Sequence, residues 1–212
     1  PIMAQAAVDL QKPTQLVTCT PNSPAQEVVG EENTVVTQKN REPYTYNTST
    51  YMGWVLTKTK ENPQEIYDFI LSHVEPIIPN NLSEYNGFLL VTPNDYSRLN
   101  QLFEVKFIEL FGRQVARDVK TFEELKHAIT VVPNERELCI QFGDGAVDFE
   151  GEILKIPLPQ HMGKGALMAI AYYVIGRLQE QFPQYYKENI HRYIERNSSE
   201  EGFGKVMSVI VE

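Results

Sequence analysis

The apolar positions of the chain predict alternating strands and helices from residue 51 onward. Two short runs, 54–57 and 88–91, are rich in aromatic, aliphatic and β-branched residues and have the composition of strands. A helix is predicted to start at Asn62-Pro63, because Asn is a favoured N-cap and Pro a favoured first helical residue. The apolar residues that follow recur at the spacing of one helix face: Ile66, Phe69, Ile70, Val74 and Ile77.

The clearest amphipathic helix follows the strand at 88–91. Residues 92–95 are typical of a helix start, since they combine a capping threonine with a proline at the first helical position. We expect Leu102, Phe103 and Phe107 to be buried, because the apolar face of this helix must cover a sheet. The full stripe contains six residues: Leu99, Leu102, Phe103, Phe107, Leu110 and Phe111.

The middle of the chain predicts a capped helix and then β-hairpins. Thr121 and Glu124 have the spacing of a capping box, in which each side chain accepts a hydrogen bond from the other residue's backbone N–H. The turn-like residues 133–136 separate the apolar runs 129–132 and 138–142, which predicts a hairpin.

The last third of the chain predicts an edge strand, two helices and a final strand. Residues 154–158 alternate apolar side chains with a lysine and a proline, which favours a strand near a sheet edge. Residues 166–181 are apolar on every side in their first half, so they predict a central, buried helix. An amphipathic helix is predicted after Pro183, and a strand at 206–211.

This order of elements predicts an α/β or α+β fold, with a mixed sheet packed by about five helices. Strands alternate with helices early in the chain and pair locally later. We therefore expect residues 51–212 to form a single globular α/β domain.

Residues 1–50 have a different composition. They contain no Phe or Trp, five of the thirteen prolines, and only Ile2, Leu10 and Leu16 among Ile and Leu residues. Such a segment buries too little apolar surface to offset its own ordering entropy. We expect an extended N-terminal arm, which is either a disordered tail or, as we prefer, an arm ordered by a neighbouring subunit.

The overall charge limits the partners. The formal net charge is −9, so phosphate backbones and anionic lipid surfaces repel the chain, and we expect neither nucleic acid nor membrane as a partner. The longest apolar stretch, 166–175, has about half the length of a membrane span. Cys19 and Cys139 are typical of idle thiols in a reducing compartment, and no apolar signal segment is present. We expect a protein of the cytoplasm, or of a particle assembled there, that is not secreted.

The densest acidic cluster suggests one kind of chemistry. Asp144, Asp148, Glu150 and Glu152 lie near Lys155, and carboxylates at strand ends can hold Mg²⁺ or Mn²⁺. This pattern gives the alternative of a metal-dependent hydrolase or nuclease-like enzyme. A solvated hairpin is the other interpretation, because neighbouring strand residues point to opposite faces. We expect no metal, no other cofactor and no catalytic group there.

A second candidate lies at residues 161–165 (His-Met-Gly-Lys-Gly), which lead into a predicted helix. Free backbone N–H groups and the helix dipole at such a start favour a phosphate or a carboxylate. The glycine spacing is not that of a Walker A loop, so a plain strand-to-helix connection is the other interpretation. No serine lies in a nucleophile elbow, and Cys139 has no basic neighbour to activate it.

The eleven tyrosines favour an interface, because one end of the side chain is apolar and the other forms hydrogen bonds. We therefore predict a non-catalytic structural or assembly subunit of a virion-like or other multi-subunit particle. Its partner is another protein or another copy of itself, engaged through the N-terminal arm. The alternatives are the hydrolase above and a regulatory or ligand-binding module. The candidate interface residues are Ile2, Leu10, Leu16, Tyr44, Tyr46, Tyr186 and Tyr193.

Overall fold

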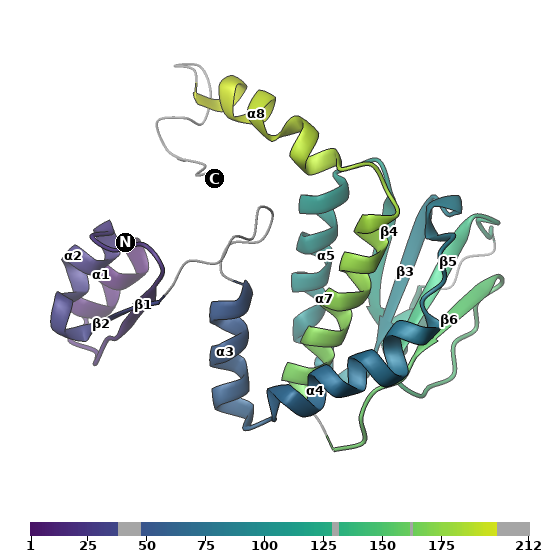
Figure 1. Cartoon of the computed structure of the whole chain (residues 1–212), viewed down its shortest axis with the longest axis horizontal. Coiled ribbons are helices and arrows are strands. Elements are labelled where there is room, and N and C mark those ends of the chain that lie inside the picture. The colour runs from purple at the N-terminus through teal and green to yellow at the C-terminus, as the bar shows by residue number, and fades with distance from the viewer. Residues whose placement is uncertain (38–47, 129–131, 162, 199–212) are drawn as a thin grey trace. The chain divides into compact units, whose positions relative to one another are not determined.

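The computed structural model describes residues 1–37, 48–128, 132–161 and 163–198. They form an α/β protein, as predicted, with two parallel sheets (Figure 1). The chain divides after Tyr51 into two compact units, and each is described by itself. None of the helices in these residues has both the length and the apolar character needed to cross a bilayer.

The N-terminal unit contains regular structure, so the expectation of an arm extended along residues 1–50 is wrong for residues 1–37. Helices α1 (Ile2–Asp9) and α2 (Pro24–Val29) accompany strands β1 (Leu16–Thr18) and β2 (Thr34–Val36), which pair in parallel. Local signals form α2, since Oγ of Ser23 accepts a hydrogen bond from the N–H of Gln26 ahead of a proline at the first helical position. Within residues 1–37, Cys19 and Val29 are the only buried apolar residues, so the core of this part is small, as the composition indicates.

The second unit is built on one four-stranded sheet with the order β4-β3-β5-β6, and every strand pair is parallel. The described elements are β3 (Gly87–Thr92), β4 (Ala116–Thr121), β5 (Glu137–Phe142), β6 (Glu152–Ile156), α3 (Thr48–Thr59), α4 (Pro63–Phe69), α5 (Ser97–Phe111), α6 (Phe122–His127), α7 (Lys164–Glu180) and α8 (Tyr185–Ser198). A π-helical turn, Ile70–Val74, and a 3-10 turn, Glu75–Ile77, continue α4.

The parallel pairing corrects the predicted hairpins and the predicted mixed sheet. Leu89 on β3 aligns with Asp118 on β4 and with Cys139 on β5, all in parallel register. Strand β5 pairs with β3 on one side and with β6 on the other, and residues 129–131 of the predicted hairpin lie outside the described residues. Residues 143–151 look like turns in the sequence but connect β5 to the start of β6, so that the two strands run in the same direction. Strand β6 does lie at a sheet edge, as predicted.

The two faces of the sheet are covered differently. Helices α5 and α7 lie side by side on one face, where Phe88 and Phe107 have ring centroids 6.1 Å apart (Figure 1). The other face is covered by α6 and by the 143–151 connection, whose Val147 packs against the cluster of Leu89, Val91, Leu125 and Cys139. Five helix residues predicted to be buried are at most 1% exposed: Phe103, Phe107, Leu167, Ile170 and Val174. Leu102 is 41% exposed, so its predicted burial is wrong.

Capping residues and apolar spacing predict most of the helices correctly, but they do not predict α3. Oδ1 of Asn62 caps α4, and Thr121 with Glu124 forms the predicted capping box at α6. Residues 54–57 were predicted as a strand but belong to α3, where Oγ1 of Thr57 donates to the carbonyl of Gly53 one turn earlier. Met52, Val55 and Leu56 are half-buried at helical spacing, and this partial burial overrides the weak strand preference of the run. The strand predicted at 206–211 lies outside the described residues.

Candidate functional site

The candidate interface residues of the N-terminal unit are mostly exposed. Ile2 is 85% exposed and Leu10 is 70% exposed, while Leu16 is half-buried in β1. Tyr44 and Tyr46 lie outside the described residues. Exposed apolar side chains on so small a unit are available for contact with a partner.

The other two candidate residues, Tyr186 and Tyr193, line one groove in the second unit. The groove has a volume of about 770 Å³ and runs between α8 and the end of α5. The two tyrosines share a helix face with Ile190, because steps of four and three residues return to the same side. Ile190 is buried where α8 packs on α5, and Ile108 and Phe111 supply the α5 wall. The structure thus brings together the apolar face that the sequence predicts for this helix.

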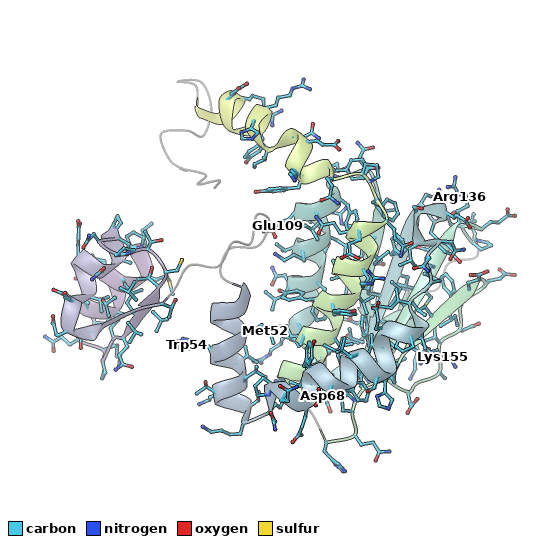
Figure 2. The ribbon with its side chains drawn as sticks, in the orientation of Figure 1. Met52, Trp54, Asp68, Glu109, Arg136 and Lys155 are labelled. Atoms are coloured by element: carbon cyan, nitrogen blue, oxygen red, sulfur yellow. The ribbon has the colours of Figure 1, made fainter. Side chains whose placement is uncertain are left out.

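Arginines gather around this groove although the whole chain is acidic. Arg113, Arg117 and Arg196 line it, and Arg192 lines an adjoining hollow of about 350 Å³. The one acidic lining residue, Glu109, already pairs with Nζ of Lys106 at 2.6 Å. Figure 2 shows Glu109 on the end of α5 that lies toward α8. Nε of Arg117 is buried without a hydrogen-bond partner in the described part of the chain. The groove therefore favours ligand segments that carry carboxylates.

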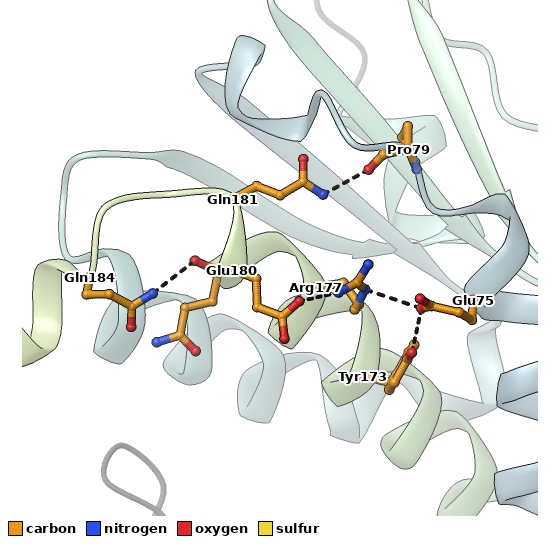
Figure 3. Close-up of polar contacts among 8 residues, drawn as sticks. Glu75, Pro79, Tyr173, Arg177, Glu180, Gln181 and Gln184 are labelled. Carbon is orange, nitrogen blue, oxygen red and sulfur yellow. Dashed lines mark hydrogen bonds and ion pairs between the residues drawn. The ribbon is translucent and has the colours of Figure 1, made fainter.

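The start of α8 is fixed by polar contacts at the end of α7 (Figure 3). Nε2 of Gln181 donates to the carbonyl of Pro79 at 2.8 Å, and its Oε1 accepts from the N–H of Leu82 at 2.8 Å. The next residue, Phe182, packs edge-on against Phe88 and Phe111, with centroids 6.0 and 5.5 Å away. One side chain thus anchors the α7–α8 connection to a distant segment, and the next anchors it to the aromatic core.

A second set of contacts ties α7 to the 3-10 turn that follows α4 (Figure 3). The hydroxyl of Tyr173 donates to Oε2 of Glu75 at 2.5 Å, and Nε of Arg177 pairs with the same oxygen at 3.2 Å. Arg177 also pairs with Glu180. Burial and the hydrogen bond to Glu75 raise the pKa of Tyr173 to about 12, so this phenol stays protonated at neutral pH. These contacts have a structural role, because they hold helices without leaving a polar group open toward a ligand.

An apolar stripe lies on the outer face of α5 next to the groove. Leu102, Val105 and Ile108 are 41%, 43% and 44% exposed. They are three residues apart, so they form a slanting row along the helix, and Ile108 also lines the groove. The apolar periodicity of the sequence predicts burial of Leu102 and does not single out Val105 or Ile108.

In the candidate anion segment, residues 161–165, backbone N–H groups at the start of α7 bind a carboxylate of the chain itself. Oε1 of Glu61 accepts hydrogen bonds from the N–H groups of Gly163 at 2.6 Å and Ala166 at 3.0 Å. Oε2 accepts from the N–H of Gly165 at 2.8 Å. Glu61 therefore satisfies three of the backbone donors at the start of α7. An external phosphate or carboxylate would have to displace it.

The Glu61 side chain reaches this position because α3 ends in a sharp turn. Lys60 has φ 64°, a left-handed conformation that stops the helix just before Glu61. Burial acts to raise the pKa of Glu61, but hydrogen bonds from the Thr59 side chain and from the α7 N–H groups outweigh it, so the pKa lies below its ordinary value. The carboxylate is ionised at neutral pH, as the dipole of α7 favours.

The acidic residues singled out in the sequence do not share one site. Glu152 accepts a hydrogen bond from the Tyr85 hydroxyl, and Asp144 is exposed on the 143–151 connection. Only Asp148 and Glu150 line one pocket, of about 240 Å³.

Two acids from neighbouring strands line this pocket as well, Asp118 on β4 and Glu137 on β5. Burial and the negative charge of Asp118 raise the pKa of Glu137 above its usual value. Nonetheless, no three His, Cys, Asp or Glu side chains among the described residues are arranged to hold a metal ion. Cys139 is fully buried, and burial together with the charge of Glu137 raises its pKa to about 12, so its thiol is unreactive.

The site residues that local sequence patterns do not predict act over long distances in the chain. Glu61 lies 102 positions before Gly163, and no local sequence pattern predicts that these two residues form a hydrogen bond. The arginines around the groove come from α8, from the turn after α5 and from β4, which only the fold brings together. Comparison of the chain with protein-family models gives no match, and comparison with curated proteins gives no significant relative.

Proposed function

We propose that this protein is a non-catalytic assembly subunit whose partner is another copy of the same chain. The exposed stripe of Leu102, Val105 and Ile108 on α5 carries the proposal, because the core of the second unit does not use it. Such side chains gain about 1.5–3 kcal/mol each when they pass from full exposure to full burial. Leaving three of them exposed in a row is consistent with a surface that another molecule covers.

The stripe can pair with the same stripe of a second copy through a two-fold axis. Leu102 and Ile108 lie at equal distances along the sequence on either side of Val105. When two α5 helices pack antiparallel with Val105 at the centre, Leu102 of one copy faces Ile108 of the other. Each surface then contacts an identical surface, as in an isologous two-fold interface.

The size of the stripe indicates a weak contact unless other surfaces add to it. Covering the exposed part of six such side chains, three from each copy, contributes on the order of 5 kcal/mol. Association costs about 4–15 kcal/mol in lost freedom, so the stripe alone gives loose pairing. We propose that the N-terminal unit adds contacts to neighbouring subunits through its exposed apolar residues, among them Ile2, Met3 and Leu10.

The solution mass of the full chain tests this function. We expect the mass to rise with concentration from 24.3 kDa toward twice that value or more. Leu102→Glu should shift this rise to much higher concentration, because it places a charge in the interface. Leu71→Glu is the matched control, since Leu71 is a similarly exposed leucine (46%) on the turn after α4. A wild-type chain that stays monomeric at every soluble concentration would contradict the proposal.

We also propose that the protein works in a reducing compartment, either the cytoplasm or a particle assembled there. Cys19 and Cys139 are free and buried, which suits a chain that does not rely on disulfides. Its net charge of −9 supports protein partners rather than nucleic acid or an anionic membrane surface.

The hydrolase alternative now depends on the pocket that Asp118, Glu137, Asp148 and Glu150 line. Calorimetric titration with Mn²⁺ separates it from the assembly function. Tight one-to-one binding that Asp148→Asn abolishes and Asp144→Asn preserves would favour the enzyme. Asp144 is the matched control, because it lies on the same connection but does not line the pocket.

A further inference from the structure

Helix α3 and the turn after it carry an exposed aromatic and basic surface. Trp54, the one tryptophan of the chain, is 56% exposed, and Lys58 follows one turn later on the same side of the helix. Together with Thr57 and Lys60 they line an open hollow of about 560 Å³. In the described part of the chain no carboxylate forms an ion pair with either lysine. These four residues, the α3 patch, therefore combine an aromatic ring with two unpaired cations.

The core of the second unit does not use Trp54. Met52 is half-buried, and it lies two positions before Trp54, so the two side chains point to nearly opposite sides of the helix. Figure 2 shows Met52 and Trp54 on these opposite sides of α3. Tryptophan is among the residues that contribute most to protein interfaces. The exposure of this side chain next to two lysines favours a partner surface that is acidic and partly apolar.

The second unit also contains a pocket of the opposite charge. Its volume is about 240 Å³, and four carboxylates line it: Asp118, Glu137, Asp148 and Glu150. Among the described residues only Asp118 has an ion-pair partner, Lys120 at 2.8 Å. Burial and the charge of Asp118 raise the pKa of Glu137, as expected where the chain's own cations do not offset the negative charge.

The lining of this pocket suits a lysine side chain better than a metal ion. Apolar residues lie between the carboxylates, among them Leu125, Pro133 and Phe149. Within the described residues no three acids, histidines or cysteines are arranged to hold a metal. A lysine has an apolar stem and a cationic head, so the stem can contact the apolar lining while the head reaches the carboxylates.

The α3 patch and the acidic pocket belong to opposite sides of the sheet. Leu56 of α3 lies against Gly165 at the start of α7, which covers one face. The pocket is lined by Leu125 of α6 and by Phe149 of the 143–151 connection, which cover the other face. One copy therefore cannot join its own two surfaces, but two copies can join them head to tail.

We propose that the α3 patch of one copy docks on the acidic pocket of a second copy, with a lysine in the pocket and Trp54 over the half-buried Phe149. The inference rests on the proposed function in that the partner is another copy, but this contact uses neither the stripe on α5 nor its two-fold axis. Each copy offers one patch and one pocket, so the contact joins unlike surfaces and extends into a ring or a filament.

Mixing two charge-reversed variants of the full chain tests this contact. Lys58→Glu/Lys60→Glu makes the patch acidic, and Asp148→Lys/Glu150→Lys places two cations in the pocket. Each variant alone should associate at least tenfold more weakly than its parent, because the attraction between patch and pocket is lost. An equal mixture should regain association, since the unchanged patch of the second variant meets the unchanged pocket of the first. Sedimentation at low salt measures the mass.

The background and the controls separate this contact from the α5 contact and from net charge. All variants are made in the Leu102→Glu chain, so the association that remains at high concentration does not depend on the stripe. Lys12→Glu/Lys155→Glu and Asp68→Lys/Asp144→Lys change the net charge by the same amounts at other exposed positions. These controls should associate like the parent, both alone and mixed. Circular dichroism confirms that each variant is folded.

Three outcomes would overturn the proposal. The first is that the Leu102→Glu chain stays monomeric at every soluble concentration. The second is that the patch and pocket variants associate as well as their controls. The third is that their mixture associates no better than either variant alone, which would mean that the patch binds another acidic surface. A Leu102→Glu chain that associates like wild type while the mixture regains association would contradict the α5 contact and leave this one standing.

Discussion

Helices α5 and α7 lie side by side on the same face of the sheet, yet they use their apolar residues differently. In α7 the buried residues surround the first turn and then continue along the side that faces the core: Gly165, Ala166, Leu167, Met168, Ile170, Ala171, Val174, Ile175 and Leu178. In α5 one face is buried, with Phe103, Phe107 and Phe111 at its centre, and the opposite face leaves three apolar side chains exposed. The core accounts for every large apolar residue in the first half of α7, but it accounts for only one side of α5.

The two helices also begin differently. The first turn of α5 has no side-chain cap, whereas the first turn of α7 is capped by Glu61 from a distant segment. The fold therefore fixes α7 at its start and leaves no large apolar side chain of α7 exposed. By contrast, α5 has apolar surface left over, which is why we assign the partner contact to α5.

The largest expected effect separates the two faces of α5. Phe107→Ala should reduce the free energy of unfolding by about 3–5 kcal/mol, because Phe107 is fully buried in an aromatic cluster. Leu102→Ala should cost less than about 1 kcal/mol in the monomer, since much of its side chain is already in water. Urea unfolding at low protein concentration measures both. Equal losses would mean that the outer face of α5 belongs to the core.

The next effect concerns the start of α7. Glu61→Gln should destabilise the protein by about 1–3 kcal/mol, since an uncharged amide replaces a carboxylate that accepts three backbone hydrogen bonds. Glu104→Gln, an exposed glutamate on α5, is the control and should change stability by less than about 0.5 kcal/mol. If both variants unfold alike, Glu61 does not cap α7.

The same contact predicts a pH dependence. The folded-state pKa of Glu61 is lower than the ordinary value of 4.5, so its ionised form stabilises the fold fully above about pH 4.5. This contribution is lost as the pH falls from 4.5 through the folded-state pKa. The stability difference between wild type and Glu61→Gln should thus be largest near neutral pH and shrink in acid. A difference that grows in acid would contradict the assignment.

The smallest effect compares two glycines of α7. Gly176→Ala should stabilise the protein by about 0.5–1 kcal/mol, because alanine is the better helix former and a Cβ there meets nothing within 4 Å. At Gly165 a Cβ would lie 2.6 Å from Oε2 of Glu61 and 2.8 Å from Cδ2 of Leu56. Gly165→Ala should therefore destabilise the protein. Thermal unfolding measures the melting temperatures of both variants. If both melting temperatures shift in the same direction, the start of α7 is not too crowded for a Cβ at Gly165.

Sequence patterns predicted the features that depend on residues close together in the chain, namely helix caps and apolar helix faces. Asn62, Thr121 and the apolar faces of α5 and α7 placed helices correctly, because caps and faces act within a few residues. The direction of strand pairing was predicted wrongly, since the glycines and acids of 143–151 look the same in a tight turn and in a connection that returns to start a parallel strand.

The candidate site was only partly predictable for the same reason. The apolar face of α8 is periodic, so the sequence predicts that Tyr186 and Tyr193 share one face, and both line the groove; their role at an interface stays a prediction. The arginines of the groove and the Glu61 cap were missed, because residues far apart in sequence meet there only after folding. Exposure of the α5 stripe was missed because an apolar stripe in a sequence does not reveal which of its residues the core covers.

Oxidative cross-linking through Val105→Cys tests the central claim most directly. In the proposed two-fold pair Val105 lies at the symmetry axis, so the two introduced cysteines come close enough for a disulfide, which requires Cα atoms about 4.4–6.8 Å apart. The native Cys19 and Cys139 are buried and should not interfere. We predict a covalent dimer for Val105→Cys under mild oxidation, with little cross-linking for the exposed control Leu71→Cys. Equal cross-linking of the two variants, or none in Val105→Cys at concentrations where the chain is associated, would contradict assembly through the outer face of α5.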